Sequence, residues 1–148
     1  MNTKTLTRVA LIAAVYTVIS LVLAPLSFGN IQVRFAEALT LLPLIYQPAI
    51  AGVTLGCFLT NLIGALMGFN PTGLLDAVIG TAATLIAAII TWRCRSKKVA
   101  GLPLISILAP VVLNFFFVGA EVAIGELVAV AVGYLLIGLL SKTKLFTE

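Results

Sequence analysis

The sequence predicts an all-α integral membrane protein, a six-transmembrane-helix bundle with cytoplasmic N- and C-termini. Hydrophobic residues make up 61% of the 148 and charged residues only 9%, whereas about 25% of the residues in a soluble domain are charged. The mean hydropathy is +1.22. One membrane helix takes about 20 residues. Six helices with short connections therefore use the whole chain, which we expect to form one domain, 1–148.

We expect these helices over about 7–24, 33–46, 49–66, 74–92, 102–122 and 126–140. The first ends before Pro25, because proline disfavours helix in the residue that precedes it. Gly29 and Asn30, both turn formers, follow it in a loop. The second helix is short for a bilayer, and the fourth ends in the basic stretch RCRSKK.

A stripe of small residues follows the third helix at four-residue spacing: Gly52, Gly56, Thr60, Gly64 and Gly68. Small side chains let membrane helices approach closely, where no hydrophobic effect drives their association. Packing inside the bundle is the favoured interpretation, and a contact with another molecule is the alternative.

Basic residues predict the orientation. Eight of the nine lie in three short segments: Lys4, Arg8, Arg93, Arg95, Lys97, Lys98, Lys142 and Lys144. The positive-inside rule places such segments in the cytoplasm, and an even number of helices puts all three there. The net charge of +4 is then an orientation signal and a match to anionic lipid. We expect no nucleic-acid partner.

Five other ionisable residues lie within or beside apolar segments, on the outer side in this topology: Arg34, Glu37, Asp76, Glu121 and Glu126. Each costs about 2.5–3.5 kcal/mol at the bilayer centre on insertion scales, and less near the interface. In a structural explanation, Arg34 and Glu37 pair at i,i+3 and the acids favour helix starts. In a functional explanation, which we favour, the five residues line an outward-facing pocket for a ligand with several hydrogen-bond donors. Asn61 and Asn114 are candidates for further contacts, or they bridge helices.

Motifs for catalysis are absent from the sequence. It contains no G-x-x-x-x-G-K-[ST] phosphate loop and no histidine for a Ser/His/Asp set. No Cys/Asp/Glu spacing suggests a metal site, and we expect no cofactor. The chain is short for an ion-driven carrier. We therefore expect a transport protein, not an enzyme, that draws its energy from a partner.

Three blocks resemble the QueT family: IQVRFAEALTLLPLI, LGCFLTNLIGALMG followed by GLLDAVIGTAATLIAA, and VVLNFFFVGAEV. This family comprises substrate-capture (S) components of energy-coupling factor transporters, associated with a deazaguanine precursor of queuosine. The resemblance covers most of residues 8–126. It implies a bundle in the cell membrane of a prokaryote that binds its small-molecule substrate from outside. It also implies docking on a membrane coupling (T) subunit that two cytoplasmic ATPase subunits drive.

The resemblance also suggests roles for particular residues. In such S components an alanine motif in the first helix contacts the coupling subunit, and Ala10, Ala13 and Ala14 occupy the matching place. A guanine-like ring presents a ring N–H beside an exocyclic amine, and one carboxylate can accept both hydrogen bonds. An aminomethyl substituent, where present, is cationic and would use a second acid. Arg34 would orient Glu37 or stack on the ring.

One spacing departs from the family pattern, because only residues 122–125 separate Glu121 from Glu126. This leaves the start of the sixth helix open. Two alternatives to the queuosine precursor also stay open. One is an S component for another vitamin-like substrate, and the other is an autonomous membrane channel or scaffold whose charges only anchor helix ends.

Overall fold

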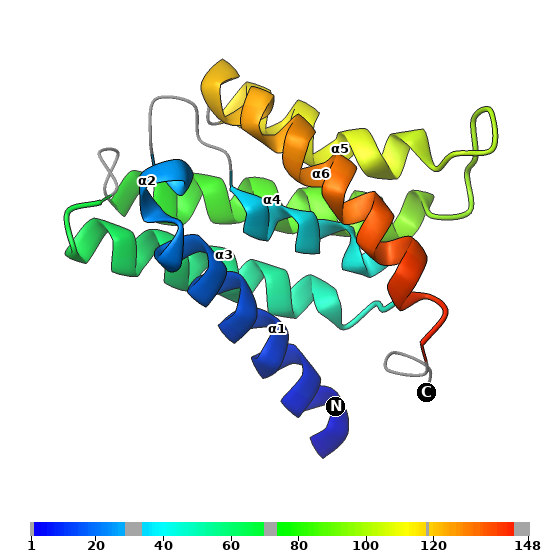
Figure 1. Ribbon diagram of the computed structural model, residues 1–148, viewed down its shortest axis with the longest axis horizontal. Coiled ribbons are helices and arrows are strands. Elements are labelled where there is room, and N and C mark those ends of the chain that lie inside the picture. The colour runs from blue at the N-terminus through cyan, green and yellow to red at the C-terminus, as the bar shows by residue number, and fades with distance from the viewer. Residues whose placement is uncertain (1, 29–33, 70–73, 118, 144–148) are drawn as a thin grey trace.

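The computed structural model describes residues 2–28, 34–69, 74–117 and 119–143, except for the side chains at 120, 121, 123 and 124. Every regular element within these ranges is a helix, which confirms the all-α class (Figure 1). The elements are α1 (Thr3–Val22), α2 (Ala24–Ser27), the 3₁₀-helix η1 (Phe35–Leu44), α3 (Ala49–Leu66), α4 (Leu74–Cys94), α5 (Leu104–Phe117) and α6 (Ala120–Leu140).

Six regular membrane helices were expected, and the described residues instead form seven helical elements. Three of these, α1, α3 and α4, are long and apolar enough to cross a membrane. The ten residues of η1 rise about 20 Å at 2.0 Å per residue, and the fourteen of α5 rise about 21 Å. Both fall short of a hydrocarbon core about 30 Å thick.

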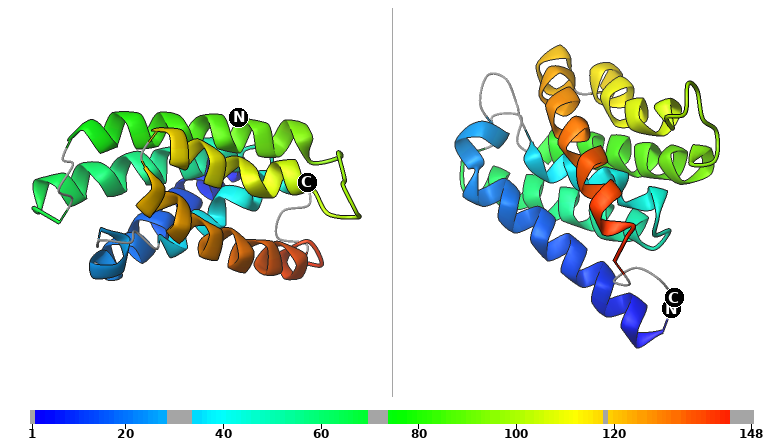
Figure 2. Two further views of the ribbon diagram at one scale, coloured as in Figure 1. Left: turned by 90° about the horizontal axis from the view of Figure 1, so that it is seen from above. Right: turned by 45° about the vertical axis from the view of Figure 1, so that its right-hand side comes forward.

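The helices α1, α3, α4, α5 and α6 pack against one another in that order, and η1 packs against every one of them. Figure 2 shows the same arrangement from two further directions, with η1 in cyan among the other helices. The short 3₁₀-helix therefore forms the centre of the bundle. Its backbone is shielded by protein, which is the condition under which irregular backbone persists at membrane depth.

The first helix begins earlier and ends earlier than the expected 7–24. Asn2 caps α1, with its Oδ1 accepting from the backbone N–H of Thr5 at 2.8 Å. The helix breaks after Val22. Pro25 then lies in the first turn of α2, where its missing N–H costs nothing. Proline thus begins a new helical turn here. Gly29 and Asn30 lie outside the described residues.

The third helix has the expected bounds, and it ends in a Schellman motif. Gly68 adopts φ +75°, and the N–H of Phe69 donates to the carbonyl of Gly64 at 2.8 Å. Glycine is favoured in this left-handed position. Gly68 therefore terminates α3 and does not extend the packing stripe.

The last two helices differ most from expectation. α5 ends at Phe117 and α6 begins at Ala120, six residues before the expected start. Gly119, at φ +131°, provides the break in a conformation open to glycine. Glu121 and Glu126 therefore do not flank a turn, as expected, but both belong to α6.

Glycines set the closest helix contacts. A Cβ at Gly56 of α3 would lie 2.7 Å from the Cβ of Tyr16 in α1, and one at Gly133 of α6 would lie 2.5 Å from the carbonyl oxygen of Ala38 in η1. Such distances exclude a side chain. The stripe on α3 thus packs inside the bundle, as favoured from the sequence.

Pro110 interrupts the backbone ladder of α5 without leaving a polar group unpaired. Proline cannot donate to the carbonyl four residues earlier, which belongs to Ser106. That carbonyl accepts instead from Thr91 Oγ1 of α4 at 3.1 Å, and Ser106 Oγ donates back to the Thr91 carbonyl at 3.0 Å. The carbonyl freed in α5 therefore takes part in a pair of hydrogen bonds between α4 and α5.

The outer surface is apolar, whereas polar groups lie inside. Val22, Leu66 and Phe116 are each more than 70% exposed, but Glu37, Asn61 and Glu126 are buried. This is the reverse of a water-soluble surface, and it suits a lipid environment.

Basic side chains gather at one end of the bundle. Arg8 of α1 lies 5.7 Å from the ring centroid of Tyr46, just after η1. Arg95 and Lys98, after α4, share a cavity with Leu44 and Ser141. We call this the basic end. It is where α1 begins and where η1, α4 and α6 end (Figure 1).

Candidate functional site

An ion pair joins η1 to α4 in the half of the bundle away from the basic end. Arg34 directly precedes η1, and its Nη2 donates to Asp76 Oδ2 in the first turn of α4 at 2.7 Å. Arg34 Nε also approaches the Ser27 carbonyl at 3.4 Å, and its guanidinium lies 5.4 Å from the Phe28 ring centroid. The side chains of Arg34 and Asp76 are only 4% and 3% exposed. Such a pair requires close geometry to offset its desolvation.

Glu37 lies in the first turn of η1, at the centre of the bundle. The hydroxyl of Tyr16 in α1 donates to Glu37 Oε1. Thr40 Oγ1 donates to the Glu37 carbonyl at 2.6 Å, which satisfies the backbone locally. Tyr16 therefore holds the carboxyl group in one orientation, because both partners are buried.

Asn61 of α3 bridges to α4. Its Nδ2 donates to the backbone carbonyl of Asp76 at 3.2 Å and approaches Cys57 Sγ at 3.5 Å. Thr84 Oγ1 of α4 donates to the same sulfur at 3.3 Å. The amide nitrogen thus has the bridging role considered from the sequence, and the amide oxygen takes no part in this bridge.

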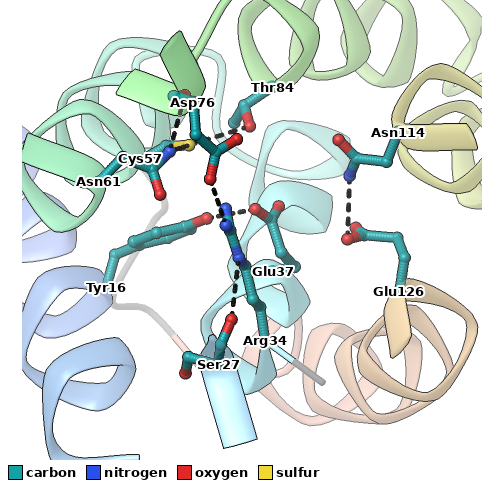
Figure 3. Close-up of polar contacts among 10 residues, drawn as sticks. All are labelled: Tyr16, Ser27, Arg34, Glu37, Cys57, Asn61, Asp76, Thr84, Asn114 and Glu126. Carbon is teal, nitrogen blue, oxygen red and sulfur yellow. Dashed lines mark hydrogen bonds and ion pairs between the residues drawn. The ribbon is translucent and has the colours of Figure 1, made fainter. Parts of the chain in front are cut away.

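Asn114 of α5 and Glu126 of α6 form a second polar link. Asn114 Nδ2 donates to Glu126 Oε2 at 3.0 Å, and both side chains are buried. Figure 3 shows Glu37 between Tyr16 on one side and the Asn114–Glu126 pair on the other. Two carboxyl groups on different elements therefore face the same interior, each held by one neutral donor.

Several acceptor atoms in this interior have no donor within the described residues. Glu37 Oε2, Glu126 Oε1 and Asn61 Oδ1 are buried and have no hydrogen-bond partner among the described residues. Burying an unsatisfied acceptor costs about 1–3 kcal/mol, and more for a charged group. A cluster of such acceptors is suited to a ligand rich in N–H donors.

Hydroxyl groups extend this set of unpaired polar atoms. Ser20, Ser27 and Thr60 are buried, and their hydroxyl oxygens lack partners among the described residues. Sequence reasoning missed these three residues and Tyr16. A signal existed for two of them, because Tyr16 and Ser20 are four residues apart in an apolar helix and so share one face.

The structure brings together most residues predicted for the site. Arg34, Glu37, Asn61, Asp76, Asn114 and Glu126 are all buried. The side chain of Glu121 lies outside the described residues. Of the expected docking residues, Ala10 and Ala14 are exposed on α1, whereas Ala13 is only 2% exposed. Ala13 is unavailable for docking, because it lies on the inner face of the helix.

An apolar helical bundle with a cluster of buried polar groups in its interior defines a class, a helical membrane protein. The chain belongs to the QueT transporter family, whose model matches residues 6–142, nearly the whole chain. Membership implies an S component of an energy-coupling factor transporter, with membrane coupling and ATPase partners, and not a catalytic enzyme. No curated protein and no solved structure gives a significant match.

Proposed function

We propose that the chain is the substrate-binding subunit of an energy-coupling factor importer in the cytoplasmic membrane of a prokaryote. It captures a queuosine precursor of the 7-deazaguanine type from outside the cell. The observation that supports this proposal is a set of buried acceptors that have no donor within the described part of the chain, Glu37 Oε2, Glu126 Oε1 and Asn61 Oδ1.

The ring edge of a 7-deazaguanine complements these acceptors. It offers a ring N–H beside an exocyclic amine, and a carboxylate can accept both as a paired hydrogen bond. Tyr16 donates to one oxygen of Glu37, and Asn114 donates to one oxygen of Glu126. The acceptors are thereby oriented before the ligand arrives, which lowers the entropic cost of binding.

Arg34 and Asp76 have a supporting role in this proposal. Their ion pair fixes the start of η1 against the start of α4, and η1 carries Glu37. Arg34 therefore positions the segment that presents the carboxyl group. Among the described residues, the buried acidic and basic side chains comprise three carboxyls and one guanidinium. This balance favours a ligand that is neutral or cationic over an anionic one.

Delivery into the cell would use partners. Lys and Arg at the basic end favour a cytoplasmic position for that end by the positive-inside rule, and the site half then faces outward. A membrane coupling subunit and two ATPase subunits supply the energy. The exposed face of α1 with Ala10 and Ala14 supports docking on the coupling subunit.

Equilibrium binding to the purified chain tests the proposal. We expect saturable binding of a 7-deazaguanine that weakens roughly thirtyfold or more in Glu37→Gln and in Glu126→Gln, because each change removes a charge partner of a buried hydrogen bond. Glu148→Gln, the same chemical change at the last residue, serves as the matched control and should bind as the parent chain does.

Three outcomes contradict the proposal. Tight binding of riboflavin or thiamine, without binding of a deazaguanine, overturns the substrate. Unchanged binding in both glutamine variants overturns the site. Uptake by vesicles that hold this chain alone, without ATPase subunits, overturns the dependence on partners and favours an autonomous channel.

A further inference from the structure

A cavity lies at the basic end, and the proposed substrate site uses none of the residues that line it. Its volume is about 480 Å³. Three parts of the chain form its walls: the end of η1, the connection between α4 and α5, and the last turns of α6. We call it the basic-end cavity.

The lining of this cavity is amphiphilic. Arg95 and Lys98 provide two cations, whereas Leu44, Ile45 and Leu135 provide apolar wall. None of the described residues that line the cavity is acidic. A ligand that matches this lining has an anionic head joined directly to an apolar body.

The guanidinium of Arg95 is held by local structure. Arg95 Nη1 donates to the Trp92 carbonyl at 2.8 Å, and the guanidinium lies 3.4 Å from the centroid of the Trp92 ring. After Lys98, Val99 and Leu102 exchange backbone hydrogen bonds of 2.9 and 3.1 Å. Positive φ at both central residues of this turn, 51° and 82°, is typical of a tight type I′ turn. The connection is thus a defined wall of the cavity.

Aromatic residues at the cavity are typical of the membrane–water interface, where lipid headgroups lie. Trp92 lies against Arg95, which lines the cavity, and Tyr134 also lines it. These two residue types concentrate at the membrane–water interface. Leu135, in the cavity wall, is 71% exposed on the outer surface of the bundle. The lining therefore continues from the cations onto the face that meets hydrocarbon.

We propose that the basic-end cavity binds an anionic phospholipid. Arg95 and Lys98 contact the phosphate, and the glycerol and first acyl carbons lie against the apolar wall. Basic pockets between membrane helices recognise anionic headgroups in this way. The proposal concerns a site apart from Glu37 and Glu126, so it stands or falls independently of the transported substrate.

Trp92 gives a direct readout, because it is the single tryptophan of the chain. The protein is purified in neutral detergent and titrated with phosphatidylglycerol, or with phosphatidylcholine of the same acyl chains. We expect a saturable change in tryptophan fluorescence with phosphatidylglycerol only. Native mass spectrometry should show a matching retained adduct.

Two kinds of variant separate charge from shape. Arg95→Gln with Lys98→Gln should weaken retention of phosphatidylglycerol roughly thirtyfold. Loss of each basic contact lowers the affinity about fivefold, and the two factors multiply. Lys4→Gln with Lys142→Gln removes the same charge from residues that do not line the cavity, and should weaken lipid retention far less.

Gly138 lines the cavity, and a Cβ there would meet nothing within 4 Å. Gly138→Leu should therefore fill the space and weaken binding with both cations present.

The proposal is overturned if the two lipids give equal responses or if the matched charge control loses as much binding as the cavity variant. Saturation of the fluorescence change by inorganic phosphate, at constant ionic strength and without lipid, would identify free phosphate as the ligand and also overturn it. A thermal melt in neutral detergent checks that each variant folds. If the double glutamine variant unfolds, the Gly138→Leu variant still tests the proposal. Unchanged retention of phosphatidylglycerol in Gly138→Leu contradicts it.

Discussion

Arg34 and Asp76 show how strongly single residues are coupled in this bundle. Their side chains are almost fully removed from solvent, and Nη2 and Oδ2 are 2.7 Å apart. In a low-dielectric interior, a charge that loses its partner cannot be compensated by water. The two residues should therefore behave as one unit when either is changed.

Substitution at this pair should be strongly non-additive. We expect Asp76→Asn to lower the free energy of unfolding by about 3–5 kcal/mol, because Arg34 then remains buried without the Asp76 carboxylate. The double variant Arg34→Met with Asp76→Leu should be more stable than either single variant, since neither member of the pair is then buried without the other. Thermal unfolding in one detergent is measured for the parent chain, for the single variants Asp76→Asn, Arg34→Met and Asp76→Leu, and for the double variant. Additive effects of the two single changes would contradict the coupling.

Sequence reasoning could identify most buried polar residues but not their partners. A charge or amide within an apolar run stands out, as Glu37, Asn61 and Asn114 do. The i,i+3 spacing suggested that Arg34 pairs with Glu37, whereas the structure pairs Arg34 with Asp76 and gives Glu37 the hydroxyl of Tyr16. Such partners lie on different helices, and their meeting depends on how η1 packs, which local spacing does not encode.

The central element is η1, a 3₁₀-helix of ten residues. Runs of this helix type beyond 3–4 residues are uncommon, because their hydrogen-bond geometry is poorer than in an α-helix. Its interior Pro43 removes one donor, and its side chains fill the middle of the bundle. The apolar composition predicted a helix here. The helix type follows from packing against five neighbouring helices, which composition does not reveal.

Close packing between η1 and α6 provides a test of this element. Gly133→Ala should destabilise the fold by about 1–3 kcal/mol, the range typical of overpacking, because the new Cβ would lie 2.5 Å from the Ala38 carbonyl oxygen. It should also weaken substrate binding, since η1 carries Glu37. Gly138→Ala, on the same helix with open space around it, should be neutral or slightly stabilising. Equal melting temperatures for the two variants would contradict the contact.

Element positions were more predictable than element ends. The 49–66 helix has the expected bounds, because apolar length and the Gly68 turn both mark its end. The last two helices were misplaced, because Gly119 was not recognised as the break between them. An acidic residue was expected to mark the start of the sixth helix, yet Glu126 lies in its interior.

At the scale of the whole molecule, α1 has two different faces. Ile12, Ala13 and Tyr16 face the bundle interior, whereas Ala10 and Ala14 are exposed. The two exposed alanines leave a shallow strip beside the larger Leu11 and Val18, which are also exposed. This strip is the surface that we propose for docking on the coupling subunit.

Bulky substitution on the strip should separate binding from coupling. We expect Ala10→Leu with Ala14→Leu to reduce co-purification with the coupling and ATPase subunits, while the isolated chain still binds its substrate. Ala13→Leu should instead lower thermal stability, because Ala13 is buried. A double variant that co-purifies with its partners at parental levels would show that docking uses another surface.

The ion pair between η1 and α4 also constrains how the chain is made. Arg34 and Asp76 are 42 positions apart in the sequence, so Arg34 leaves the ribosome well before its partner does. Until α4 is synthesised, a lone guanidinium is costly in hydrocarbon and favours the interface, where its long side chain can reach water. We therefore expect η1 to settle into the centre of the bundle only after α4 has been synthesised and Asp76 is available to Arg34.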